Sequence, residues 1–336
     1  MSTEVVLFPP RATKLGLRKH LRSLGYLPVQ HLWSWPKGSV HFHWFEEEDF
    51  KSTDGVEATI YPTSEEERNN YKAGAWTLHT RTRASASRFD KEYQNHTIRT
   101  ARKMFGGDFY NDWRGKNRYV ELWTETKSPA GRGIYLSYHW VLQNVRAVQR
   151  ALPQPIEVPS HGPLAELTRL HDPVRVLYNA LVPFAVAALE HFFSQTFIIL
   201  LRFDDQARRR LRDQTRKVEM SEVFALSQGE RRIEELVAQW YSFQNIQSVH
   251  NAFYEWFGID VWKLLRRRKR VGRRISVLER RLNHLIEFRH GIVHRFELDF
   301  GLGRDEISEL LESARVLIEV FVDHLEQERG IKIRDE

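Results

Sequence analysis

Apolar and polar residues alternate in short runs over the first 150 residues of the chain. The runs lie at 39–45, 55–62, 75–83, 118–123 and 133–140. A period of two is typical of half-buried strands, and loops containing glycine or proline separate the runs. Helices are predicted over 87–104 and from about Tyr138 to Leu152. Because few of the strands are separated by helices, the pattern predicts an α+β domain with a mostly antiparallel sheet.

A helical period replaces this alternation after a proline-rich segment. Residues 153–163 contain four prolines, which disfavour both helices and strand ladders. Beyond them, apolar residues recur every three to four positions, as in 230–243 and 306–325. We therefore predict an α+β domain at 1–152, a linker at 153–163 and an all-α bundle of five or six helices at 164–330.

Composition narrows the class of protein. The chain has no cysteine, which excludes disulfides, thiolate zinc sites and cysteine nucleophiles and fits a reducing cytoplasm. Its N-terminus lacks the basic and then apolar pattern of a signal peptide. The most apolar stretch, 176–201, is interrupted by Pro183, Glu190 and His191. We interpret it as a buried helix, so no membrane partner is expected.

The net charge of +7 is unevenly distributed. Residues 1–150 hold 23 Lys and Arg against 16 Asp and Glu, whereas 151–336 hold 28 of each. A basic surface favours a polyanion such as RNA, although single charged runs are as often only solvated faces. The candidate RNA-binding residues are Arg266, Arg267, Arg268, Lys269, Arg270, Arg273 and Arg274, and, alternating along one strand, His79, Arg81 and Arg83.

The segment 101–119 mixes glycine with aromatic and basic residues. Glycine lets a backbone approach a ligand closely, and aromatic rings stack on bases. We interpret the N-terminal domain as a sensor or a substrate-positioning module.

One arginine interrupts an apolar helical stripe near the end of the chain. In 275–300 the stripe contains Leu278, Leu282, Leu285 and Ile286, then Ile292, Val293 and Phe296. Arg289 occupies the position that would complete it. His290 and His294 are four residues apart and therefore lie on one flank, with Glu287 beside them. A guanidinium binds phosphate oxygens and an imidazole transfers protons near neutral pH, and phosphodiester cleavage requires both.

The segment "FRHGIVHR" resembles the R-x(4–6)-H motif of the HEPN superfamily. Of the 15 histidines, only His294 follows an arginine by five positions. The long helix after the motif and the early apolar helix around Glu190 are also similar to those of HEPN bundles. The resemblance covers roughly residues 160–330 and does not extend to the first half of the chain.

The resemblance implies a metal-independent endoribonuclease without a cofactor. Many such proteins act as toxins or abortive-infection effectors in antiviral defence, as homodimers with two motifs facing one cleft. It implies that His294 is the catalytic histidine, that Arg289 stabilises the phosphate, and that His290 is a polar accessory residue; Glu287 and Glu190 are further accessory candidates. The expected partners are RNA, with transfer RNA as one candidate, a second copy of the chain, and a regulatory ligand or antitoxin.

Three alternatives stay open. Arg289 could form a structural ion pair with an acid on another helix or with Glu287 of a partner. The domain could be a non-catalytic module that binds nucleotide or RNA and dimerises. His290 and His294 also have zinc-ligand spacing, which would suit a metal-dependent hydrolase with Glu287 as third ligand.

Overall fold

The computed structural model describes residues 2–30, 35–123, 127–154, 167, 172–272 and 274–334. The chain divides into two compact units, Met1–Arg132 and Gly133–Glu336. This division falls in the first turn of helix α4 (Pro129–Ala151), earlier than the predicted linker at 153–163. α4 belongs to the second unit because it packs on that unit's last helix, where Gln149 Nε2 donates to the Ser308 carbonyl at 3.4 Å. Residues 155–163 of the predicted linker lie outside the described residues.

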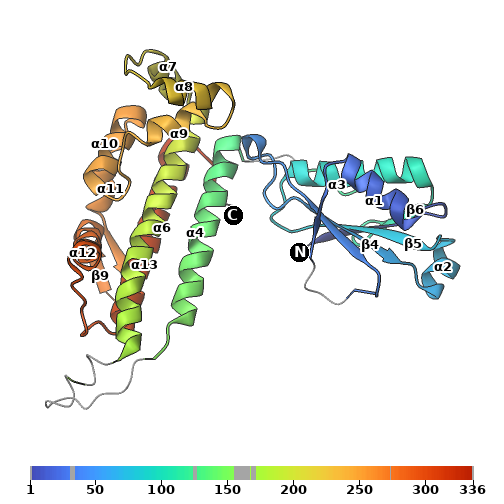
Figure 1. The fold of residues 1–336 in the computed structure, drawn as a ribbon, viewed down its shortest axis with the longest axis horizontal. Coiled ribbons are helices and arrows are strands. Elements are labelled where there is room, and N and C mark those ends of the chain that lie inside the picture. Colours follow the sequence, from blue (N-terminus) through green and yellow to red (C-terminus); the bar gives the residue numbers. More distant parts are fainter. Residues whose placement is uncertain are drawn as a thin grey trace. The chain divides into compact units, whose positions relative to one another are not determined.

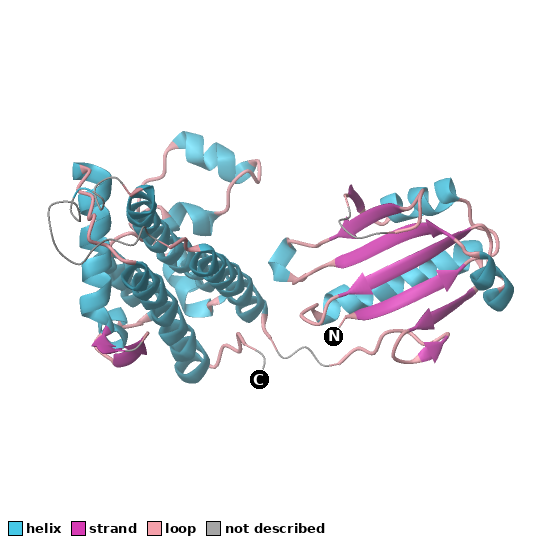
Figure 2. Cartoon of the chain, turned by 90° about the horizontal axis from the view of Figure 1, so that it is seen from below, coloured by secondary structure: helices cyan, strands magenta, loops and turns pink. Residues whose placement is uncertain are grey.

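An antiparallel sheet forms the first unit (Figures 1 and 2). Its seven strands lie in the order β2-β3-β4-β5-β1-β6-β7, and each neighbouring pair is antiparallel. β5 is central: its Leu78 lies opposite Leu7 of β1 on one side and Ile60 of β4 on the other. The predicted antiparallel sheet is therefore confirmed. The strands are β1 (Thr3–Phe8), β2 (Leu27–Val29), β3 (Val40–Trp44), β4 (Val56–Pro62), β5 (Trp76–Thr82), β6 (Asp108–Asn111) and β7 (Gly115–Lys116).

Two helices, α1 (Lys14–Ser23) and α3 (Arg88–Phe105), pack on one face of this sheet (Figure 2). Ser87 caps α3 by accepting from the backbone N–H of Asp90, whose carboxylate accepts in return from the N–H of Ser87. The core between helices and sheet is apolar, and its aromatic centre is Trp44 stacked on Tyr93 with ring centroids 3.5 Å apart. The short α2 (Glu65–Tyr71) and a 3-10 turn at Glu48–Phe50 complete the unit.

Two predicted strands are wrong. Residues 118–123 form no strand, because the side chain of Asn95 takes both backbone groups of Val120: it donates to the carbonyl at 2.9 Å and accepts from the N–H at 2.8 Å. Residues 133–140 lie inside α4, where Ile134, Ser137 and Val141 are buried at helical spacing. β-Branched and aromatic residues there concealed a period of 3.6.

The second unit is a helical bundle centred on α6 (Pro173–Phe203) (Figure 1). Phe193 of α6, Phe253 of α10 and Phe321 of α13 pack edge to face, with Phe253 and Phe321 centroids 4.9 Å apart. The remaining helices are α7 (Asp205–Arg212), α8 (Met220–Ser227), α9 (Ile233–Ala238), α10 (Ile246–Phe257), α11 (Val261–Leu265), α12 (Leu278–His290) and α13 (Arg304–Arg329).

The predicted buried helix at 176–201 is confirmed as part of α6. By length and composition alone α6 could cross a membrane, because an 18-residue segment of it has a mean hydropathy of 1.6, but 61% of that segment is buried inside the fold. The bundle also contains one element that was not predicted, a hairpin of β8 (Arg268–Val271) and β9 (Arg274–Val277). Val271 anchors this hairpin because its side chain is fully buried, and β8 packs against α13.

Three histidines predict how stability changes with pH. Burial lowers the pKa of His20, His191 and His324 below the usual 6.5. On acidification, these histidines are therefore protonated at a higher pH in the unfolded chain than in the folded one. Their contribution to the free energy of unfolding should be complete above pH 6.5 and decrease as the pH falls through and below that value. We expect melting temperatures measured by calorimetry to decrease with acidification. The variant His20→Gln should lose part of the pH dependence in the first unit. The control His284→Gln, which replaces an exposed histidine, should retain the pH dependence of wild type. Identical pH profiles for the two variants would show that the buried His20 does not contribute to it.

Candidate functional site

The arginine–histidine motif lies at the C-terminal end of α12. Leu278, Leu282 and Leu285 are buried and fix this helix against α6 and α13. Arg289 follows Leu285 by one helical turn and is half-buried, at the edge of the apolar stripe. The position of Arg289 is therefore determined by the core packing of the helix that carries it.

The helix widens into a π-helical turn, Gly291–Arg295, immediately after His290. A π-helical turn brings residues five apart closer to one face than an α-helix does, and such turns are frequent at functional sites. It includes His294, whose exposed ring lies 4.6 Å from that of His290, centroid to centroid. The structure thus places the two imidazoles side by side, as their spacing predicted.

Arg289 has no counter-charge within the described residues: its guanidinium forms neither a hydrogen bond nor an ion pair there. Two other arginines nearby, Arg281 and Arg295, are paired with acids. Arg281, two turns earlier on the same helix, lies 3.4 Å from Glu309. The structural ion pair with an acid on another helix, considered for Arg289, is therefore not formed in the described part of the chain.

A second arginine and a carboxylate complete the surroundings of the histidines. Arg295 Nε and Nη2 donate to the two carboxylate oxygens of Glu297 at 2.6 and 2.8 Å. This pair lowers the pKa of Glu297, and the charge of His290 acts in the same direction. A Cβ on Gly291 would lie 3.0 Å from Glu297 Oε2, so glycine makes room for the carboxylate. Glu297 was not predicted from the sequence. The one feature that could have indicated it is its position two residues after Arg295, which directly follows the motif.

Two apolar residues beside the motif are exposed, although they were predicted to continue the core stripe. Val293 is 48% exposed and Phe296 81% exposed. The reason is that the helix ends at Phe296, whose φ of 55° lies in the left-handed region, which is costly for a residue other than glycine. The motif is therefore bordered by apolar surface that this chain does not itself cover.

Residues 164–327 match the model of the RiboL-PSP-HEPN family. The C-terminal half of the chain is a HEPN-family domain. Searches of curated proteins and of solved structures gave no match. The family indicates an RNA-related function, and HEPN domains commonly bind RNA and dimerise. The first unit lies outside the matched residues.

The two accessory acids do not join the histidines of the HEPN domain. Glu287 is exposed and forms no hydrogen bond or ion pair among the described residues. Glu190 accepts from Gln244 Nε2 at 3.1 Å and lines a hollow of about 410 Å³ that includes no residue of the motif. No group of three or more His, Cys, Asp or Glu side chains in the described chain is arranged to hold a metal ion. The metal-dependent alternative therefore lacks a ligand set there.

The predicted basic run precedes the motif helix as the β8–β9 hairpin. Most of its described basic side chains are exposed, and Lys269 is half-buried. Arg266 is partly neutralised by Glu279, 3.8 Å away. Because α12 separates the hairpin from the motif, the two lie about 18 Å apart along the helix axis. The exposed residues are Arg266, Arg267, Arg268, Arg270 and Arg274; Arg273 lies outside the described residues.

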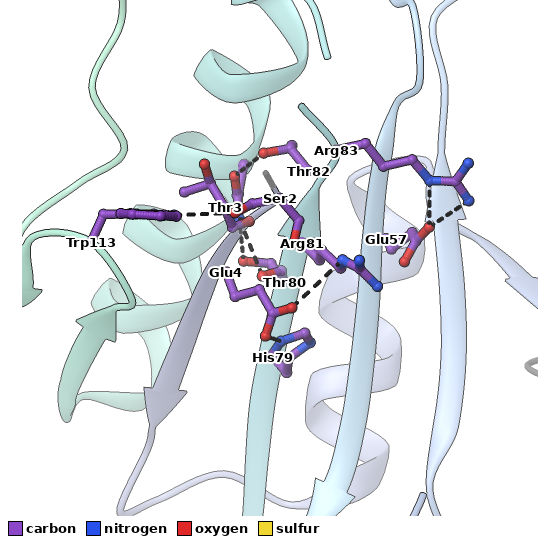
Figure 3. A network of polar contacts seen from close by, with 11 residues as sticks. Ser2, Thr3, Glu4, Glu57, His79, Thr80, Arg81, Thr82, Arg83 and Trp113 are labelled. Atoms are coloured by element: carbon purple, nitrogen blue, oxygen red, sulfur yellow. Dashed lines mark hydrogen bonds and ion pairs between the residues drawn. The ribbon is translucent and has the colours of Figure 1, made fainter. Parts of the chain in front are cut away.

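The three candidates on β5 and directly after it are paired with acids of neighbouring strands (Figure 3). His79 is only 8% exposed and its Nε2 lies 3.1 Å from Glu4 Oε2, and this hydrogen bond lowers the pKa of Glu4. Arg81 Nε is 3.6 Å from Glu4 Oε1, and Arg83 Nη2 is 3.1 Å from Glu57 Oε1. Since Glu4 and Glu57 neutralise Arg81 and Arg83, the RNA-binding interpretation of this strand face loses its electrostatic basis.

The unpaired state of Arg289 leads to a stability prediction. A leucine at this position continues the apolar stripe, so Arg289→Leu should leave the free energy of unfolding of the protomer unchanged or raise it by up to about 1 kcal/mol. Arg281→Leu, which breaks the contact with Glu309, is the matched control and should lower it by up to about 1 kcal/mol. Denaturant titration at a concentration that keeps the chain monomeric measures both. A loss of about 3–5 kcal/mol for Arg289→Leu would show that the arginine has a buried partner after all.

Proposed function

We propose that the HEPN domain is a metal-independent endoribonuclease whose active site is assembled from the motifs of two copies of the chain. The observation that carries this proposal is Arg289: an arginine without a counter-charge on an otherwise apolar stripe, one turn before a pair of adjacent imidazoles. An unpaired, half-buried cation is costly for a protomer alone. A phosphate of bound RNA would supply the missing negative charge, and a guanidinium matches phosphate geometry.

The apolar border of the motif supports assembly from two copies. Val293 and Phe296 flank His294 and are exposed in the single chain. Exposed apolar side chains around polar groups are typical of interaction surfaces. In a two-fold dimer the same patch contacts itself, so this border would bring both motifs to one cleft. Because no hydrogen bond or ion pair joins Arg289 to His294 within the described chain, we infer that Arg289 of one copy and His294 of the other act on the same phosphate.

The reaction that these groups can perform needs only proton transfer and charge stabilisation. His294 takes the proton of the RNA 2′-hydroxyl, whose oxygen attacks the adjacent phosphorus. Arg289 stabilises the additional negative charge on the phosphate oxygens in the transition state. The bond to the 5′-oxygen breaks, and that oxygen takes a proton from a second imidazole, for which His290 is adjacent to His294. The products carry a 2′,3′-cyclic phosphate and a 5′-hydroxyl.

The biological setting is part of the proposal and rests on the HEPN resemblance alone. We propose an effector or toxin of prokaryotic antiviral defence that acts in the cytoplasm on RNA, with transfer RNA as one candidate, and that a regulatory ligand or antitoxin restrains.

Cleavage in the presence of EDTA tests the proposed activity. Total RNA and transfer RNA are incubated with wild type, Arg289→Ala and His294→Ala, and product ends are identified. We expect the histidine variant to lose about 10²- to 10⁴-fold in rate, because it lacks the group that transfers the proton. The arginine variant should lose about 10²- to 10³-fold. DNA should resist cleavage because it lacks the 2′-hydroxyl.

His284→Ala is the control, since this histidine is exposed on the same helix and lies outside the motif. It should cleave like wild type. If wild type and all variants are equally inactive as folded dimers, while RNA still binds, the domain is a binding module and the proposed catalysis is wrong.

A further inference from the structure

A second basic surface lies in the first unit, away from the cations of β5. It consists of the β6–β7 hairpin with Trp113, Arg114 and Lys116, the following Arg118 and Tyr119, and Arg99 and Lys103 of α3; we name it the hairpin surface. Residues 96–121, which include it, contain six Lys and Arg against three Asp and Glu. The local charge is therefore positive, in contrast to the balanced pairs on β5.

The helix and the hairpin form one continuous surface. The guanidinium carbon of Arg99 lies 5.3 Å from the ring centroid of Tyr119, which connects α3 to the segment after β7. Arg102 Nε donates to the Gly107 carbonyl at 3.0 Å, connecting the end of α3 to the start of β6. These contacts hold the exposed cations of α3 beside those of the hairpin.

Three of the cations on this surface are available to a ligand. Arg99, Lys103 and Arg118 are exposed, and among the described residues none of them forms a hydrogen bond or ion pair. The other two, Lys116 and Arg114, are 2.7 Å from Asp108 and 3.7 Å from Glu121. Acids hold Arg81 and Arg83, whereas these three cations have no acid partner among the described residues, so the hairpin surface keeps positive charge that the strand face lacks.

An aromatic ring is held in place at the turn of the β6–β7 hairpin. Trp113 is 58% exposed, yet its indole Nε1 donates to the Ser2 carbonyl at 3.1 Å, a contact drawn in Figure 3. Its backbone N–H donates to Asn111 Oδ1 at 2.9 Å. An exposed indole that is held in place can stack on a base with little further loss of side-chain entropy.

We propose that the hairpin surface binds single-stranded RNA, with phosphates at Arg99, Lys103 and Arg118 and a base stacked on Trp113. Single-stranded nucleic acids bind to unpaired cations, which contact successive phosphates, together with exposed aromatic rings, which stack on bases. That the strand is RNA rests on the proposed function of the HEPN domain. The surface then supplies RNA affinity from the first unit, separate from the residues that perform the cleavage.

The test measures binding without cleavage, in the full-length chain carrying His294→Ala. Anisotropy of a fluorescein-labelled single-stranded RNA of about 12 nucleotides is titrated at about 50 and 200 mM salt. We expect Trp113→Ala to bind about tenfold more weakly, because stacking on the ring is lost. Trp113→Phe lacks the bond to Ser2 but keeps a ring, and it should stay within about threefold of the parent.

The cations are tested through the salt dependence. Lys103→Gln combined with Arg118→Gln removes two phosphate contacts, so the slope of log affinity against log salt should fall by about 1.4. Arg83→Gln is the matched control, because it also removes an arginine of this unit, but one that is paired with Glu57. It should bind like the parent.

Four results would overturn the proposal: no RNA binding by the parent, unchanged binding by Trp113→Ala and the double variant, equal weakening by Trp113→Phe and Trp113→Ala, or competition by polyglutamate as strong as by unlabelled RNA. The last would indicate an acidic protein partner. The cleavage assay is independent of these readouts. If wild type cleaves RNA but the variants of the hairpin surface bind RNA like the parent, only the proposed RNA-binding surface is rejected. If these variants bind RNA more weakly but wild type does not cleave it, only the proposed nuclease activity is rejected.

Discussion

The packing of α12 against α6 and α13 determines where the motif stands, and the rest of the site depends on it. Leu278, Leu282 and Leu285 are buried in the same core that holds the phenylalanines of α6, α10 and α13. A rigid helix of this kind can hold a charged residue at its end in a fixed position without a local partner. The free energy of the core thus offsets the cost of leaving Arg289 without a counter-charge.

The region around the motif departs from regular structure in three ways. The helix widens into a π-helical turn, Phe296 adopts a left-handed conformation, and apolar side chains face outward. Each feature costs stability in an isolated chain. Their concentration within seven residues of the arginine is consistent with a surface selected for contact with something outside the chain, which we propose is a second copy together with RNA.

The sequence predicted the class of both units and the position of the motif, because these depend on local periodicity and spacing. It did not assign β1, although that strand pairs with β5 at the middle of the sheet. It could not reveal which cations are free. His79 meets Glu4 across 75 positions of the chain, so only the folded sheet shows that the β5 candidates are neutralised. Likewise, only the folded β6–β7 hairpin shows that Arg118 has no acid partner in the described part of the chain and that Trp113 is exposed. Glu297 lies next to the motif because of the π-helical turn, which was not predicted.

If Arg289 acts across a dimer, two variants that are inactive alone should complement each other when they are mixed. Arg289→Ala and His294→Ala are co-expressed with different tags, the mixed dimer is purified through both tags, and its RNA cleavage is compared with that of each variant alone. We expect the mixed dimer to regain activity, because it contains one intact Arg289 opposite one intact His294. A mixed dimer as inactive as its parents, alongside an active wild type, would contradict an active site shared between two copies.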